Sequence, residues 1–296
     1  MRLLNIVSTR TLVLSLTLFG AGGLLVPRTA RAGHDGSPAL IKSAIAANSV
    51  DAIQAELERS EYLVCGACSD LVLPLVDHLD YRVRKAAAWW IARRAINRQV
   101  YVSMLGRLSQ PDSLLARNAA DVLGELGYTG AIPALSAALS NPIYSAEARA
   151  AMARALGSIG NPAATPALVG ALGSADPAVK AGALAALRAV NGFRQGDVAT
   201  PLLADPDAQV RAEAALTLGA VLRTGKTGVA PAGVDGLLGA LANDPSANVR
   251  KKAAWSLGEM GAPSALAAAG LQAAASVDAD PAVRSLAQIA IGKLSR

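Results

Sequence analysis

Aromatic side chains are scarce in this sequence, at 3% of the residues, although 52% of the residues are hydrophobic. A chain with so few rings must fill its core with small and aliphatic side chains, which favours closely packed helices. Histidine is also rare, with His34 and His78 alone. Two histidines give little basis for a Ser-His-Asp catalytic set. A zinc site built on the two cysteines would need two further ligands, and the two histidines are the only ones that the chain offers. We therefore expect no catalytic residues, no metal and no cofactor.

An apolar run over residues 11–26 follows two arginines near the N-terminus, and Ala30-Arg31-Ala32 offers small residues at the positions that a signal peptidase reads. Residues 1–32 are therefore predicted to be a signal peptide, cleaved between Ala32 and Gly33. The run is shorter than the ~20 residues that cross a bilayer, so a retained transmembrane anchor is the alternative. The leader predicts an exported bacterial protein, periplasmic or secreted, with no membrane span after cleavage.

Positive charge is concentrated in this leader. The whole chain has 28 Lys and Arg against 22 Asp and Glu, a net charge of +6. Removing the four arginines of the leader, which has no acidic residue, leaves 24 basic and 22 acidic residues and a net charge of +2. A nearly neutral chain lacks the dense basic surface that a nucleic-acid backbone requires. We expect a protein partner and no nucleic acid.

An internal repeat dominates the rest of the chain, and the stretch Val249 to Gly261 (VRKKAAWSLGEMG) shows it best. Its aliphatic residue seven places after the Arg, which we call the anchor, returns every 31 to 39 residues. The anchors are Ile91, Leu123, Leu156, Leu187, Leu218, Leu257 and Ile291. Apolar residues also stand eight and four places before each anchor, which places all three on one helical face.

Residues typical of helix starts and helix ends recur in the repeats. Asp is followed by Pro at 176, 205, 244 and 280, which predicts an N-cap followed by a Pro in the first turn. Gly127, Gly160 and Gly261 come four places after an anchor, where a helix ends readily in the left-handed conformation. A second apolar segment, such as TPALVGALG from Thr165, lies between such a Gly and the next Asp-Pro. Each repeat is therefore predicted to be a pair of helices.

A helix pair of roughly 30 residues cannot bury its apolar stripes alone, so successive pairs must stack. The predicted fold is all-α, a right-handed α-solenoid of stacked antiparallel helix pairs, with about seven repeats over residues 69–296. Its first repeat is expected to begin with a helix over 70–79. Residues 33–68 are predicted to form an N-terminal helical cap, with short helices over 38–48 and 50–60. Glycines directly after the anchors, as at Gly124 and Gly157, are expected to let neighbouring helices approach closely.

The pattern D-P-x-x-V-R-x-x-A-A-x-x-L-G-x-h-G, followed by a Pro-initiated helix, resembles HEAT repeats of the short kind known from phycobilisome lyases. This resemblance covers residues 69–296 and implies a protein-binding scaffold more than an enzyme. Deoxyhypusine hydroxylases, which resemble this fold, bind two irons through His-Glu dipeptides, and this chain has no His-Glu. Bilin lyases use a cytosolic pigment, which the export signal contradicts. We expect a non-enzymatic scaffold of the cell envelope that binds its partner on the solenoid face.

The two cysteines, Cys65 and Cys68, stand three residues apart. In an exported protein such a pair is most simply a disulfide, and its small loop should stabilise the fold only modestly. The alternative is a redox centre with one thiolate stabilised at a helix N-terminus, which would make the chain an exported thiol-disulfide redox protein. Ser69 follows Cys68 where covalent haem attachment would require His.

Trp89 and Trp255 occupy the same place, two residues before their anchors, and a lysine precedes each by four residues. Helical geometry turns both toward the rim, whereas Trp90 points to the core. Aromatic and arginine side chains on a rim are typical of interface hot spots. The candidate partner-binding residues are Arg82, Lys85, Trp89, Arg93, Lys251 and Trp255. The alternative is that both tryptophans pack over the adjacent helix pair.

A basic residue stands at the head of most second helices, at Arg84, Arg149, Arg211, Arg250 and Arg284, with Lys180 in the fourth repeat. Facing an Asp of the preceding or next loop, these residues would form a ladder of ion pairs, as in similar HEAT proteins. Ala116 in the second repeat and Ala148 in the third depart from the pattern. We expect the ladder to be interrupted there.

The longest interval between anchors contains RTGKTGVAPAG, residues 223–233. Its Gly, Thr and Pro content predicts an enlarged, flexible loop between helices. Because inserted loops of repeat proteins often take part in binding, this loop is a further candidate for the binding surface.

Overall fold

The computed structural model describes residues 36–63, 65–223, 229–260 and 264–294. The chain divides into a unit Met1–His34 and a unit Asp35–Arg296, and the structure described below belongs to the second unit. The predicted signal peptide lies outside the described residues.

The described residues form helices joined by short connections, without a strand. The N-terminal helices are α1 (Pro38–Ala46), α2 (Val50–Arg59), α3 (Gly66–Val72), η1 (Leu73–Asp77), α4 (Tyr81–Ala92), α5 (Asn97–Arg107) and α6 (Ser113–Leu126). The middle of the chain contains η2 (Thr129–Ala131), α7 (Ile132–Ser140), α8 (Ala146–Ile159), η3 (Pro162–Ala164), α9 (Thr165–Ala171), α10 (Pro177–Ala189) and η4 (Gly196–Ala204). The C-terminal helices are α11 (Ala208–Leu222), α12 (Pro231–Asn243), α13 (Ala247–Gly258), α14 (Ala265–Val277) and α15 (Pro281–Leu294).

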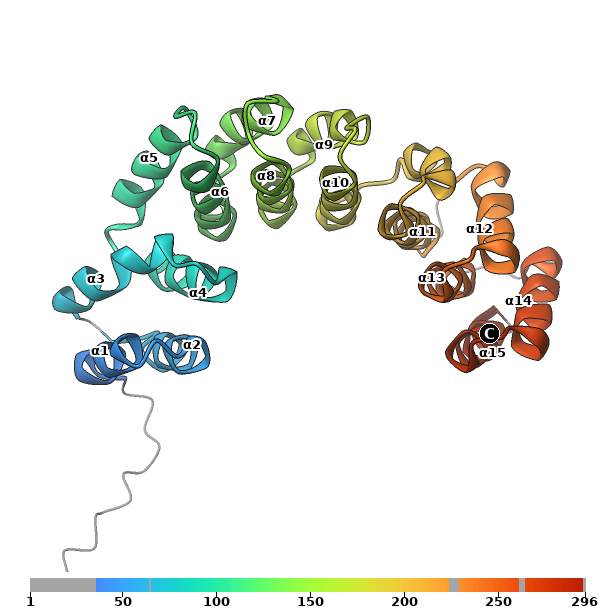
Figure 1. The fold of residues 1–296 in the computed structure, drawn as a ribbon, viewed down its shortest axis with the longest axis horizontal. Coiled ribbons are helices and arrows are strands. Elements are labelled where there is room, and N and C mark those ends of the chain that lie inside the picture. Colours follow the sequence, from blue (N-terminus) through green and yellow to red (C-terminus); the bar gives the residue numbers. More distant parts are fainter. Residues whose placement is uncertain (1–35, 64, 224–228, 261–263, 295–296) are drawn as a thin grey trace, which may run out of the picture. The chain divides into compact units, whose positions relative to one another are not determined.

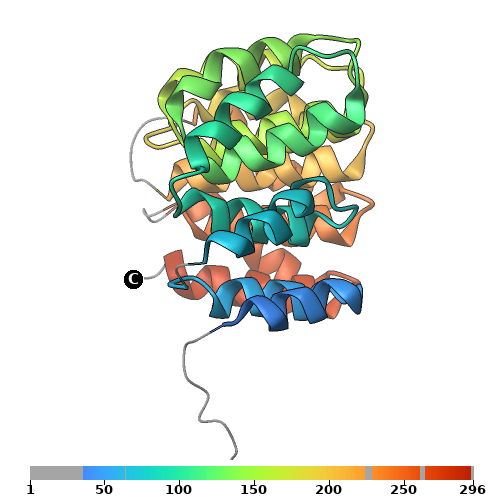
Figure 2. The same ribbon diagram turned by 90° about the vertical axis from the view of Figure 1, so that its left-hand side faces the viewer.

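Successive helix pairs stack in a row with two layers. The second helices of the pairs, α4, α6, α8, α10, α11, α13 and α15, each pack on the next one, and the first helices cover their other side. Within this unit the second helices lie on the inner side of the row (Figure 1). The turned view shows helices of successive pairs lying roughly parallel (Figure 2). The prediction of an all-α solenoid of antiparallel helix pairs is confirmed.

The core lies between the two layers and runs from pair to pair. Six anchors, from Ile91 to Leu257, are completely buried. The seventh, Ile291, is only half-buried. It belongs to α15, which packs against α13 and α14, and the described residues place no further helix pair beyond it. This last anchor therefore packs against the core as predicted but is not enclosed, because complete burial requires a neighbour on both sides.

Close approach between second helices depends on the glycines that follow the anchors. A methyl group at Gly157 would lie 2.8 Å from the Cα of Ala186, and one at Gly124 would lie 2.9 Å from the Cα of Ala155. No side chain fits at such distances without moving a backbone. These contacts bring α6, α8 and α10 together as the sequence predicted, and they explain how the core is filled with so few aromatic rings.

Helix boundaries follow the predicted pattern in part. Gly127 and Gly160 end α6 and α8 with φ angles of 72° and 68°, as expected, and Gly261 lies outside the described residues. Asp176 caps α10 by accepting a hydrogen bond from the backbone of Ala178 at 2.8 Å, and Asp280 accepts one from Ala282 at 2.7 Å. Two of the four Asp-Pro predictions are therefore confirmed.

The other two Asp-Pro predictions are wrong. Asp207, rather than Asp205, is the N-cap of α11 and accepts hydrogen bonds from two backbone N–H groups. α13 begins after Ser246, two residues beyond Asp244. The carboxylates of Asp205 and Asp244 instead meet basic side chains of the preceding repeat. Their role is therefore set by a contact between repeats.

The N-terminal helices continue the row. α1 and α2 form a pair, and α2 packs on α4 as one second helix packs on the next. The indole Nε1 of Trp90 donates to the hydroxyl of buried Ser60 at 3.0 Å and ties α4 to the end of α2, so Trp90 lies in the core as predicted. The first helix of the first repeat begins at Gly66 rather than Asp70. It therefore crosses the boundary expected between residues 68 and 69.

Candidate protein-binding surface

A ladder of side chains at the N-terminal ends of the second helices links successive repeats and so holds the exposed face of these helices in place. Arg211 shows the repeating unit of this ladder. Its Nη1 donates to the backbone carbonyls of Asp205 and Pro206, in the loop before its own helix, at 2.9 and 3.0 Å. Its Nε and Nη2 donate to the two carboxylate oxygens of Asp244, in the next loop, at 2.6 and 2.9 Å. One guanidinium thus joins two successive loops by a bidentate contact.

The same unit recurs toward the C-terminus. Arg250 donates to the carbonyl of Asp244 at 2.9 Å and to both oxygens of Asp278 at 2.8 and 2.9 Å. Arg284 then donates to the carbonyl of Asp278 at 2.7 Å. In the fourth repeat Lys180 replaces Arg and pairs with Asp205. The C-terminal second helices are therefore held in register by polar contacts as well as by the core.

These contacts shift the protonation equilibria of the loop carboxylates. Burial alone would raise the pKa of Asp244, but hydrogen bonds from Arg211 and a backbone N–H lower it below its usual value of 3.8. Asp278 has a lowered pKa chiefly because Arg250 donates to it. Each carboxylate is therefore bound in its charged form.

The second and third repeats interrupt this ladder. Ala116 occupies the Arg position in the second repeat, and Arg117 pairs instead with exposed Glu147 at 2.6 Å. Arg149 donates to the carbonyl of Leu139 at 2.8 Å and makes no ion pair among the described residues. Ser174 stands two residues before the cap of the next second helix, the place that Asp205 holds one repeat later. The loop therefore has no carboxylate at the ladder position to pair with Arg149.

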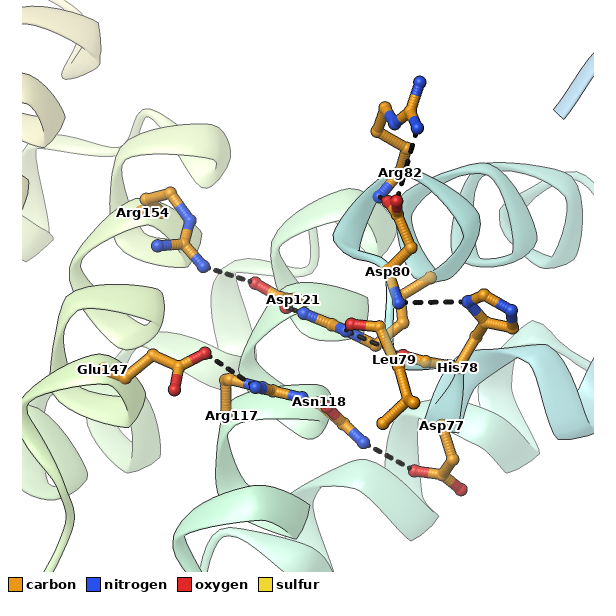
Figure 3. A network of polar contacts seen from close by, with 11 residues as sticks. Asp77, His78, Leu79, Asp80, Arg82, Arg117, Asn118, Asp121, Glu147 and Arg154 are labelled. Carbon is orange, nitrogen blue, oxygen red and sulfur yellow. Dashed lines mark hydrogen bonds and ion pairs between the residues drawn. The ribbon is translucent and has the colours of Figure 1, made fainter. Parts of the chain in front are cut away.

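Arg84 of the first repeat pairs with an aspartate of the next second helix and not with a loop aspartate. Its Nη1 donates to the carbonyls of His78 and Leu79 at 2.7 and 2.8 Å, as in the ladder. Its other edge reaches Asp121 in α6 at 2.7 Å, and Arg154 binds the second oxygen of Asp121 at 3.0 Å (Figure 3). Asp121 was not predicted as a site residue. The only sequence signal is that it stands two residues before its anchor, where Trp89 and Trp255 stand in their repeats.

The predicted tryptophan sites lie on the layer of second helices. Trp89 is half-buried in a hollow of about 470 Å³ between α2 and α4, which we call the α4 hollow. Arg82 and Lys85 also line it. The Arg93 guanidinium lies 4.1 Å from the Trp89 ring centroid, within the range of a cation–π contact. The structure thus brings together Arg82, Lys85 and Trp89 of α4 and the candidate Arg93, which directly follows this helix.

Trp255 is half-buried in a second hollow, of about 280 Å³, which we call the α13 hollow. It is lined by Leu216 of α11, by Asn248, Lys251, Lys252 and Trp255 of α13, and by Leu286 of α15. The candidates Lys251 and Trp255 therefore lie together. Lys252 was not among the predicted residues, although its position three residues before Trp255 could have identified it.

A third hollow, of about 710 Å³, lies beside the two cysteines. The structure pairs Cys65 with Cys68, with Cα atoms 5.3 Å apart. Cys65 is half-exposed and lines the hollow, whereas Cys68 is buried. Because Cys65 is the N-cap of α3, its sulfur accepts a hydrogen bond from the Cys68 backbone at 3.0 Å.

Arg94 forms one wall of this third hollow and is tied to the backbone. Its guanidinium stacks over Trp90, 3.2 Å from the ring centroid, and donates to the carbonyls of Ser60 and Glu61 at 2.9 and 3.2 Å. Burial, reinforced by the nearby charge of Arg93, lowers the pKa of Arg94 to about 10. This side chain joins α4 to the turn after α2 and is not free to bind a ligand.

The described part of the chain contains no group of three or more His, Cys, Asp and Glu side chains placed to hold a metal ion. None of its helices combines the length and hydropathy needed to cross a bilayer.

Comparison with solved structures supports the same architecture. An engineered protein is 21% identical over 88% of this chain and 82% of its own, with a TM-score of 0.53. YIBA_ECOLI is 16% identical over 87% of this chain and 92% of its own, with a TM-score of 0.52. Importin beta is 15% identical, with a TM-score of 0.55, and the match spans 83% of this chain and 38% of importin beta. At such identities the likeness concerns the fold alone.

Comparison by sequence identifies the family. No curated protein in the comparison matches the chain. The model for PBS lyase HEAT-like repeats matches residues 115–141. The model for HEAT repeats matches residues 143–219 and 196–292, which together span just over half of the 296 residues. With stacked helix pairs, buried anchors and this match, the chain belongs to the HEAT-repeat family.

Proposed function

We propose that this chain is a non-enzymatic scaffold that binds a protein partner on the exposed face of its second helices. The α4 and α13 hollows carry the proposal, because each presents a half-buried tryptophan beside lysine on that face. Tryptophan and arginine surrounded by less exposed apolar groups are typical of interface hot spots. The HEAT-repeat fold supports this interpretation, since solenoids of this kind offer extended binding faces.

On α10, between the two hollows, this face has small side chains. The positions that hold Lys85 and Trp89 in α4 hold Ala181 and Ala185 in α10, and both alanines are partly exposed. A partner on this face would approach the helix backbone closely at α10. On α6 and α8 it would meet Asp121 and Arg154, which stand at the position of Trp89.

The proposal places this scaffold in the cell envelope of a bacterium. The predicted leader over residues 1–32 supports it, since an apolar run after two arginines and before Ala-Arg-Ala is typical of exported precursors. Mass analysis of the protein recovered from the periplasm would test cleavage. A mature protein beginning at Gly33 is expected, whereas an intact N-terminus in the membrane fraction would favour the retained anchor.

Crosslinking followed by affinity purification from the exported fraction tests the binding face. The combined substitution Trp89→Ala and Trp255→Ala should remove the specific partner that wild-type protein captures. Leu266→Ala is the matched control, because Leu266 is 59% exposed and belongs to α14 in the other layer. Capture of the same proteins by the double tryptophan variant would contradict the proposed face.

A thiol-disulfide redox protein is the second candidate, because Cys65 is half-exposed at the edge of a hollow. In such a reaction a substrate dithiol would be oxidised to a disulfide while the Cys65–Cys68 pair is reduced to two thiols. Maleimide labelling after treatment with a mild dithiol separates the candidates. Labelling of the folded protein would favour the redox function, whereas labelling only under denaturation with strong reductant would indicate a structural disulfide.

A further inference from the structure

The two tryptophan hollows differ in how their positive charges are compensated. In the α4 hollow, Arg82 pairs with Asp51 at 2.9 Å and with Asp80 at 3.3 Å. Lys85 lies 3.6 Å from Glu125. The basic groups of this hollow are therefore already matched by carboxylates of the same chain.

The α13 hollow has no such compensation. Neither Lys251 nor Lys252 makes an ion pair within the described ranges 36–63, 65–223, 229–260 and 264–294. Glu213 of α11 pairs with an arginine of α10, and Glu259, which directly follows α13, pairs with a lysine of α15. Two ammonium groups thus stand beside an indole without a carboxylate of their own.

The volume and the lining residues of the α13 hollow indicate which class of ligand it can bind. A space of about 280 Å³ is below the usual range of small-molecule pockets, so it suits one inserted side chain of a larger partner. Leu216, Leu286 and Trp255 supply its apolar lining, and Asn248 and the two lysines supply its polar lining. The complementary surface is an apolar side chain flanked by negative charge.

We infer that the α13 hollow binds an acidic protein segment in which Asp or Glu lies next to a leucine or an aromatic residue. This inference rests on the proposed scaffold function and specifies its partner. The apolar side chain fills the hollow beside Trp255, and the neighbouring carboxylates pair with Lys251 and Lys252. Electrostatic complementarity of this kind governs the choice of partner and the association rate.

Fluorescence anisotropy with two labelled peptides tests the inference on the full mature chain. One peptide alternates glutamate with leucine, and the second replaces every glutamate by glutamine. The first should bind at least about 10-fold more tightly, and added salt should reduce the difference. Equal affinity for both peptides would overturn the inference.

Substitutions locate the binding site. Two variants should each lower the affinity for the acidic peptide by about 10-fold or more. One combines Lys251→Glu with Lys252→Glu, and the other is Trp255→Ala. Lys42→Glu combined with Arg98→Glu is the matched control, because it reverses two exposed charges in α1 and α5, outside both hollows, and should leave the affinity unchanged. Equal weakening by this control would indicate long-range attraction without a site and would overturn the inference.

Two further measurements separate this inference from the proposed function. Single-stranded DNA and vesicles with anionic headgroups should not compete with the peptide, and effective competition by either would overturn the choice of a protein segment. A random peptide library selected on the wild-type chain should return acidic sequences with leucine or aromatic residues. Selection of neutral or basic sequences that still require Trp89 and Trp255 would preserve the scaffold and reject the acidic partner. Selection of sequences that bind independently of both tryptophans would reject the proposed binding face itself.

Discussion

Arg84 and Asp121 form an ion pair in which both side chains are almost completely buried, at 3% and 1% exposed. The pair joins α4 to α6 between the first two repeats, where the intervening loop offers no ladder aspartate. Two charges removed from water in this way are stable only while each has its partner. Arg84 is satisfied on its other edge by backbone carbonyls, so the contact is complete.

Asp121→Ala should therefore destabilise the fold by about 3 to 5 kcal/mol, since it leaves a buried guanidinium without its carboxylate. Urea unfolding followed by circular dichroism measures the change. Glu147→Ala is the control, because the Glu147 side chain is 69% exposed in its pair with Arg117, and a loss of at most about 1 kcal/mol is expected there. Similar losses in both variants would contradict the importance of burial.

Two glycine substitutions should have opposite effects on stability. Gly157→Ala should destabilise the protein by about 1 to 3 kcal/mol, because its methyl group would meet the Cα of Ala186 at 2.8 Å. Gly239→Ala in α12 should stabilise by up to about 1 kcal/mol, because a Cβ there has no atom within 4 Å and alanine favours a helix. Thermal unfolding compares the two variants with wild type. Equal effects would show that α8 and α10 are free to separate.

Acid should weaken the ladder. The pKa of Asp278 is lower in the folded protein than its ordinary value of 3.8, so the unfolded state binds more protons in this range. The stability that Asp278 contributes is therefore complete above that value and is lost as the pH falls through the folded pKa. The difference in unfolding free energy between wild type and Asp278→Asn should be largest near neutral pH and should shrink below pH ~4. A difference that is constant with pH would contradict the role of the charged carboxylate.

Two substitutions in α13 distinguish an interior residue from a surface one. Leu257 is completely buried, and Leu257→Ala should cost about 2 to 5 kcal/mol. Trp255 is half-buried on the exposed side of the helix, and Trp255→Ala should cost clearly less while it abolishes partner binding. Chemical denaturation provides the comparison. A loss at Trp255 as large as that at Leu257 would show that the indole is part of the core.

The sequence by itself was sufficient for the fold. Spacing of four and eight residues before each anchor defines a helical face, and a period near 30 residues requires that such faces be shared between neighbours. These properties depend on residues close together in the chain. For the same reason the burial of six anchors, the core position of Trp90 and the left-handed glycines at 127 and 160 could all be predicted.

Tertiary structure decided the roles of the charged residues. Asp205 and Asp280 both precede Pro in the sequence, yet the first pairs with Lys180 of the preceding repeat and the second caps its own helix. Arg84, which binds Asp121, lies 37 residues earlier in the chain, and Arg211, which binds Asp244, lies 33 residues earlier. The register in which neighbouring helices stack selects such partners. It pairs Lys85 with Glu125 and gives Lys251 and Lys252 no ion pair among the described residues. Because the energy of a charge depends on everything that surrounds it in space, no local pattern could have distinguished the two tryptophan hollows.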